Sequence, residues 1–168
     1  LQNLAVQAGS ALRGASDVEQ GVDSSLTFAD ATDAVFRSLS DQISVLPPAT
    51  ELQASQAQFE DLLVDAAVKA GLGADAQDHL APSAGDIANV MLSGLEALDE
   101  VSADPIEALR ELAQTASVLQ HEASSDIEAA VEAAAGEAGD VSALSALLAS
   151  FTGEALEAAI EVAPTGNV

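Results

Sequence analysis

Apolar residues recur at every third or fourth position along most of the chain. This spacing places them on one side of an α-helix, so the pattern is typical of amphipathic helices that pack around a common core. No stretch alternates apolar and polar residues with the period of two that a half-buried strand requires. We therefore predict an all-α fold, a compact multi-helix bundle of six to eight amphipathic helices with short loops.

Capping signals divide the first part of the chain into helices. Gly14 is placed to end a first helix, and Ser16 with Glu19 forms a capping box that opens the next one. Thr27 then caps a long helix that the two prolines at 47–48 end. The apolar stripe of this long helix consists of Phe28, Val35, Phe36, Leu39, Ile43 and Leu46.

A further helix starts from the capping box of Thr50 and Gln53. Gly71 followed by Leu72 predicts its end, with the glycine left-handed and the leucine packed back on the last turn. Residues 73–82 are predicted to form a loop that contains one helical turn. The apolar stripe of the helix consists of Leu52, Phe59, Leu63, Ala66, Ala67 and Ala70.

Ser83 and Asp86 open the predicted helix with the most regular stripe in the chain. Gly94 lies within that stripe, where it costs the helix about 1 kcal/mol relative to alanine. We expect this glycine to mark a close contact with a neighbouring helix. The stripe consists of Ile87, Val90, Met91, Gly94, Leu95, Leu98 and Val101.

Asp104, Pro105 and Glu107 predict another helix start, with a capping aspartate, proline at the first position and an acid in the first turn. Ser125 and Glu128 predict the start of a separate alanine-rich helix. The first stripe consists of Ile106, Leu109, Leu112, Ala113, Ala116 and Leu119, and the second of Ile127, Val131, Ala134 and Ala138.

The length of 168 residues favours one helical domain over 1–163 followed by a tail or linker at 164–168. Within it, Thr152–Gly153 is predicted to break the last helical segment. Residues 28–72 and 84–122 each read as two long helices around a proline turn, which leaves a weakly duplicated helical hairpin as a possibility. The start at Leu1 and the linker-like end favour a processed chain or a piece of a longer one.

Composition restricts both the core and the chemistry. With four Phe and no Trp or Tyr, the core must be built from Leu, Ile, Val and Ala. No cysteine is present, which excludes disulfides, thiolate nucleophiles and Cys-ligated metal sites. No run of 18 apolar residues occurs, so we expect no membrane insertion.

Charge is the strongest compositional signal. Twenty-eight acids and four bases give a formal net charge of −24. Nucleic acids and anionic lipid surfaces would be repelled, so neither is expected as a partner. Salty surroundings, weak non-specific divalent cations or a basic protein partner could offset the repulsion. Because the acids are spread along the chain and not clustered, salt or calcium is favoured over a dedicated basic partner.

The four bases have partners within their own predicted helices. Asp33–Arg37 and Asp65–Lys69 are spaced by four residues and Glu107–Arg110 by three, which suits local ion pairs worth about 0.2–0.5 kcal/mol each. A clamp for an anionic substrate would need free bases, so such a substrate is not expected.

Histidine chemistry is limited to His79 and His121, and neither has a second ligand or a nucleophile at motif spacing. We interpret His121 as a solvated residue near a helix C-terminus and His79 as a surface loop residue. The sharper alternative for the loop is a weak cation site of Asp75, Asp78 and His79. Phosphate-loop, dinucleotide and calcium-loop motifs are missing, so no catalytic, cofactor-binding or metal residues are predicted and no cofactor is expected.

Two carboxylate clusters follow helical spacing: Glu96, Asp99 and Glu100 form one, and Glu154, Glu157 and Glu161 form the other. Paired carboxylates do acid–base chemistry when one of them lies in an apolar pocket. Both clusters lie opposite the leucine stripes, so we interpret them as solvated faces.

These features favour a non-enzymatic structural or interaction module of a secreted, cell-surface or filament-forming protein adapted to salty surroundings. A protein partner or self-association is expected, and the alanine-rich C-terminal third is the favoured surface. One alternative is a helical carrier of a small apolar ligand. Another is an intracellular protein of a halophile that binds a basic partner.

Overall fold

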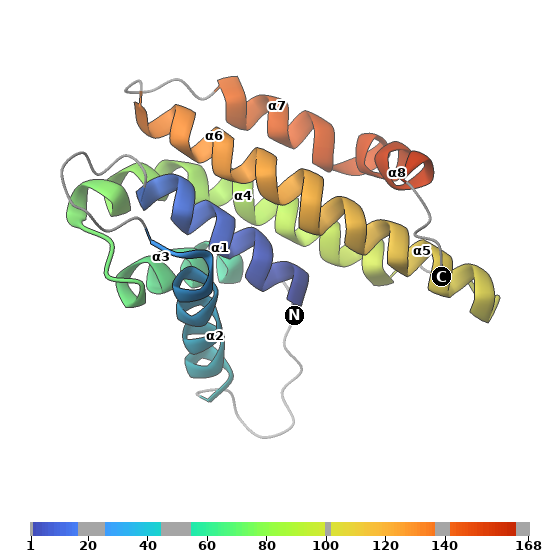
Figure 1. Cartoon of the computed structure of the whole chain (residues 1–168), viewed down its shortest axis with the longest axis horizontal. Coiled ribbons are helices and arrows are strands. Elements are labelled where there is room, and N and C mark those ends of the chain that lie inside the picture. Colours follow the sequence, from blue (N-terminus) through green and yellow to red (C-terminus); the bar gives the residue numbers. More distant parts are fainter. Residues whose placement is uncertain (1, 17–25, 45–54, 100–101, 137–141, 164–168) are drawn as a thin grey trace.

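The computed structural model describes residues 2–16, 26–44, 55–99, 102–136 and 142–163. Within these ranges the fold is all-α, as predicted, and contains no strand. The helices pack into a bundle with the N-terminal helix in its middle (Figure 1). Their bounds are α1 Gln2–Ser16, α2 Phe28–Ser44, α3 Gln56–Lys69, α4 Ala74–Asp99, α5 Pro105–Ser117, the π-helix η1 Val118–Ala123, α6 Ser124–Gly136, α7 Ser142–Phe151 and α8 Gly153–Val162.

Helix α1 forms the centre of the bundle. Eleven of its 15 residues are buried, because α2, α4 and α6 surround it. Small side chains allow this close packing, and Gly14 is the extreme case: a Cβ there would overlap the backbone carbonyl of Glu128 in α6. The prediction that Gly14 ends the helix is therefore wrong, because the helix continues to Ser16. The helix that the box of Ser16 and Glu19 would open falls outside the described residues.

Helix α2 begins where predicted. The Thr27 hydroxyl accepts a hydrogen bond from the Asp30 backbone N–H at 3.2 Å and so caps the helix. The buried face differs from the predicted stripe, because Phe28, Phe36 and Ile43 are 40%, 45% and 47% exposed. The helix turns smaller side chains toward its neighbours, and its buried residues are Ala31, Ala34, Val35, Ser38 and Leu39.

The predicted end of α3 is confirmed. Gly71 has a φ of 76°, and its N–H donates to Val68 O at 3.1 Å. The N–H of the buried Leu72 donates to Ala67 O at 3.1 Å, which completes the left-handed glycine motif. The described helix starts from Ser55 as N-cap, whereas the predicted box of Thr50 and Gln53 falls outside the described residues.

The predicted loop at 73–82 is wrong, because α4 already begins at Ala74 and holds Pro82 inside it. A proline in a helix interior costs about 3 kcal/mol. Burial of Ala76 and Leu80, at 0% and 1% exposure, extends the stripe of Ile87 by two further turns and favours the longer helix.

Gly94 of α4 is confirmed as a close contact. A Cβ at this position would lie 2.8 Å from Leu119 Cδ2 in η1, closer than real side chains approach. The missing side chain of Gly94 therefore makes room for Leu119, which is itself 1% exposed.

Helices α5, η1 and α6 follow one another without a break, so the separate start predicted at Ser125 is wrong (Figure 1). The N-cap of α5 is confirmed, since Asp104 accepts hydrogen bonds from the N–H groups of Ile106 and Glu107. At the junction of η1 and α6, Ser124 Oγ donates to Leu119 O at 2.8 Å. A serine hydroxyl can thus bond to the backbone inside a helix as well as cap its start.

The stripe predicted for the start of α5 is also wrong. Ile106 and Leu109 are 82% and 69% exposed, because the first turns of α5 extend past the neighbouring helices (Figure 1). Its buried residues are instead Gln114 and Thr115. At the other end of the chain, the predicted break is confirmed: Gly153 has a φ of 54°, and α7 and α8 meet at a bend of 64°.

Candidate functional site

An open groove of about 740 Å³ lies between the C-terminal part of α4, the middle of α5 and helix α8. Its floor is partly apolar, from Ala97 of α4 and from Leu156 and Ile160 of α8. Five carboxylates surround this floor, and we call the whole feature the acidic groove. The carboxylates are Glu96, Asp99, Glu111, Glu157 and Glu161.

The acidic groove joins the two carboxylate clusters that the sequence shows far apart. Glu96 and Asp99 reach it from α4, and Glu157 and Glu161 reach it from α8. All four side chains are exposed, which confirms the prediction of solvated faces. What the sequence pattern did not reveal is that the two faces border the same groove. Of the remaining members, Glu154 is exposed outside it and Glu100 is not described.

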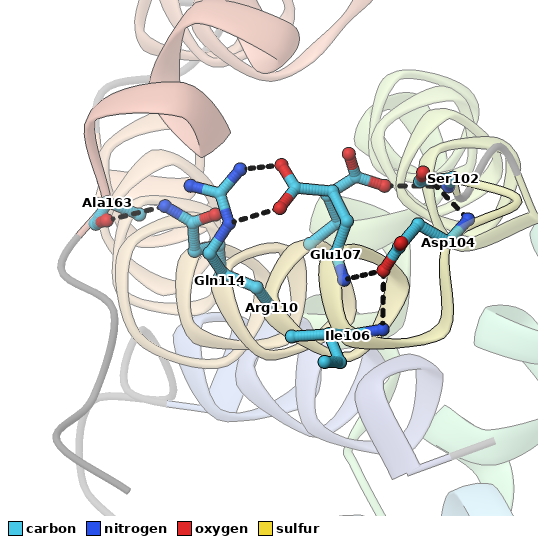
Figure 2. Close-up of polar contacts among 8 residues, drawn as sticks. Ser102, Asp104, Ile106, Glu107, Arg110, Gln114 and Ala163 are labelled. Carbon is cyan, nitrogen blue, oxygen red and sulfur yellow. Dashed lines mark hydrogen bonds and ion pairs between the residues drawn. The ribbon is translucent and has the colours of Figure 1, made fainter.

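Helix α5 contributes Arg110, the one basic residue in the lining of the groove (Figure 2). Its guanidinium is engaged by Glu107, with Nε 3.2 Å from Oε2 and a second contact through the terminal nitrogen. These hydrogen bonds hold the pKa of Arg110 above its ordinary value. Glu111, one helical turn after Glu107, accepts a hydrogen bond from the Ser102 N–H at 2.7 Å. The charge of Arg110 is thus offset within α5 itself.

Helix α5 also contributes two largely buried polar residues to the lining of the groove. Gln114 is 5% exposed, and its Nε2 donates to Ala163 O at 2.9 Å, which ties α5 to the end of α8 (Figure 2). Thr115 is 3% exposed and lines the groove, and its hydroxyl makes no hydrogen bond with another described residue. The hydroxyl is therefore an acceptor at the groove that the chain itself leaves unused.

The weak cation site, the alternative interpretation of residues 73–82, is not assembled. Asp75, Asp78 and His79 lie in the first turns of α4, with both aspartates exposed. Over the described parts of the chain, no three His, Asp or Glu side chains come together in a way that could hold a metal ion. His121 is solvated as predicted, but it lies inside η1 and not near a helix C-terminus.

A second polar cluster joins α2 to α3. Ser38 Oγ donates to Asp65 Oδ2 at 2.6 Å, and Lys69 Nζ contacts Asp65 and also Asp41 at 3.0 Å. The hydrogen bonds from Lys69 and then from Ser38 hold the pKa of Asp65 below its ordinary value. Ser38 is completely buried, so its hydroxyl cannot reach a substrate. This cluster connects two helices and is no candidate for chemistry.

All three predicted ion pairs are present: Asp33–Arg37, Asp65–Lys69 and Glu107–Arg110. Sequence spacing missed the pair of Arg13 with Glu128, at 3.1 Å, which links α1 to α6. It also missed the contact of Lys69 with Asp41. Both are formed between helices and have no local spacing to reveal them. Every base of the chain is therefore engaged by a carboxylate.

No single described helix has the length and apolar composition to cross a membrane. Helices α7 and α8 meet both criteria only as a pair, which is bent by 64°. Comparison with known proteins gives no assignment: no family model matches the chain, and no curated protein or solved structure is significantly similar to it.

Proposed function

We propose that this chain is a non-enzymatic interaction module of a secreted, cell-surface or filament-forming protein adapted to salty surroundings. The observation that carries the proposal is the acidic groove, where α4 and α8 present carboxylates side by side around a partly apolar floor. A cationic partner or dissolved salt would lower the electrostatic repulsion between these carboxylates.

The state of the bases supports the same proposal. Each Lys and Arg is already paired with a carboxylate of the chain, so no free base remains to offset the net charge of −24. Raising the ionic strength from about 0.1 M to about 1 M shortens the Debye length from about 10 Å to about 3 Å. Repulsion between the exposed carboxylates is then strongly reduced, which is the physical sense of adaptation to salt.

The lining of the groove argues against one of the two alternative functions, the carrier of an apolar ligand, and leaves the other open. A carrier of a small apolar ligand needs a largely apolar pocket, whereas five carboxylates border this one. An intracellular halophile protein with a basic partner would use the same groove, so that alternative differs in location more than in chemistry. We retain it as the second candidate.

Sedimentation velocity and circular dichroism in about 0.1 M and about 1 M NaCl, with and without calcium, test the proposal. We expect the thermal stability to rise with salt or calcium, and self-association to appear once repulsion is screened. Full stability at low salt, together with a monomer under every condition and no binding to any basic protein, would contradict it. Helix that forms only near molar salt would instead favour the halophile alternative.

A further inference from the structure

We propose that the acidic groove binds a Lys- or Arg-bearing amphipathic segment of a different protein, with the apolar side of that segment on the groove floor. This inference rests on the proposed function, since it names the partner of the interaction module.

The groove is lined by unpaired carboxylates. Glu96 and Asp99 of α4 line the groove together with Glu157 and Glu161 of α8, and none of these four forms a hydrogen bond or ion pair with another described residue. The positive charge of Arg110 is offset by Glu107 beside it. The groove therefore has a strongly negative field with unused acceptors, which suits ammonium and guanidinium groups.

Two polar side chains of α5, Gln114 and Thr115, line the groove and hold unused acceptors. The Thr115 hydroxyl, on a side chain 3% exposed, has no partner among the described residues. In Gln114, Nε2 is used by Ala163 O, and no described group donates to its side-chain carbonyl. Both oxygens can accept hydrogen bonds from an N–H donor, so they offer acceptors to a cationic side chain that enters the groove.

The groove is large, and its lining combines carboxylates with apolar side chains. A volume of about 740 Å³ is far larger than a single cation needs, and no described cluster has the convergence of a metal site. Leu156 and Ile160 add apolar surface to the floor. A segment with basic residues on one side and leucines on the other matches both features, in the manner of a helix laid in a groove.

The occupant cannot be a second copy of this chain. Arg13, Arg37, Lys69 and Arg110 are all the bases that the sequence contains, and each is already paired. A second copy would also bring another net charge of −24. The cationic segment must therefore come from a different protein.

The test uses the whole chain and a labelled helical peptide that carries Leu on one face and Lys on the other. Fluorescence anisotropy in about 0.1 M NaCl gives the Kd. The groove variant is Glu157→Gln with Glu161→Gln. Its control is Glu154→Gln with Glu122→Gln, two exposed acids outside the groove, so the net charge changes equally in both. We expect the groove variant to raise the Kd about tenfold and the control to raise it less than about twofold.

A second pair of variants tests the role of the Thr115 hydroxyl without a change of charge. Thr115→Val keeps the shape of the side chain but removes the acceptor, and we expect it to raise the Kd by about fivefold. Thr115→Ser keeps the hydroxyl and is expected to bind the peptide as the native chain does. Circular dichroism confirms that each variant remains helical.

Equal weakening in the groove variant and its control would overturn the inference, since attraction would then be spread over the whole surface. Absence of peptide binding would overturn it too. So would competition by spermine at the same concentration as the peptide, because the groove would then select small polycations. If the peptide does not bind while salt or calcium still drives self-association, this inference fails and the proposed function stands.

Discussion

Gly14 of α1 lies directly against the backbone carbonyl of Glu128 in α6, and Arg13 beside it forms an ion pair with the Glu128 side chain at 3.1 Å. The two helices are thus joined at this point both by close approach of their backbones and by charge. Because α1 is the central helix, the contact fixes the spacing of the bundle core.

Gly14→Ala is expected to lower the free energy of unfolding by about 1–3 kcal/mol. The added Cβ would overlap a backbone atom of Glu128, so α1 and α6 must separate, and the better helix propensity of alanine offsets little of that cost. Urea unfolding followed by circular dichroism measures the change.

Gly85→Ala in α4 is the matched control. A Cβ there would meet the flexible ends of Glu60 and Gln56, at 3.2 and 3.3 Å, and these can move away. We expect this variant to be neutral or stabilised by up to about 1 kcal/mol. Equal losses at Gly14 and Gly85 would show that the α1–α6 contact has no special role.

Gly94→Ala is expected to destabilise the chain because its Cβ would crowd Leu119 of η1, at 2.8 Å from Cδ2. The second variant, Leu119→Ala, leaves a cavity and costs about 2–5 kcal/mol by itself. In the double variant the new methyl group partly fills that cavity, so the combined loss should be smaller than the sum of the single losses by more than about 0.5 kcal/mol. Strict additivity in the double-mutant cycle would contradict the contact.

Asp65→Asn is expected to lower the free energy of unfolding at neutral pH by about 1 kcal/mol, because it weakens the hydrogen bonds from Lys69 and Ser38 to a half-exposed carboxylate. The folded-state pKa of Asp65 is below its unfolded value of about 3.9, so the contribution is complete above that value. It is lost as the pH falls through the folded-state pKa. Urea titrations from neutral to acidic pH should show the two proteins converging at the acid end.

Asp33→Asn provides the comparison for this pair, since Asp33 and Arg37 form an exposed pair within a single helix. We expect a loss of at most about 0.5 kcal/mol. A loss as large as that of Asp65→Asn would mean that the connection between α2 and α3 adds nothing.

Gln7→Met is expected to raise the free energy of unfolding by about 1–3 kcal/mol. Gln7 is 1% exposed in the middle of α1, and its Nε2 is buried without a hydrogen-bond partner, so an apolar side chain of similar size removes an uncompensated desolvation. Thermal or urea unfolding measures the gain.

Gln114→Met should have the opposite effect. Its Nε2 donates to the carbonyl of Ala163, which is 6% exposed, and the substitution leaves that carbonyl without its donor. We expect a loss of about 1–3 kcal/mol. Changes of the same sign in the two variants would show that pairing of the buried amide does not decide its energetic effect.

The sequence by itself determined the helical class, several helix ends and the local ion pairs. These depend on short-range spacing: Gly71 followed by Leu72 ends α3, Asp104 caps α5, and Arg37 meets Asp33 four residues away. Gly94 could also be identified, because an unfavourable residue inside a strong helix needs a packing reason.

Only the tertiary structure decided which parts of each helix are covered and which distant residues meet. Burial of Leu80 extends α4 through Pro82, and the first turns of α5 extend past their neighbours with Ile106 exposed. The acidic groove exists because the carboxylates of α4 and α8, some 60 positions apart, border one space. Helical periodicity determines in which direction a side chain points from the axis of its helix. The packing of whole helices determines whether a neighbouring helix, a groove or solvent lies in that direction.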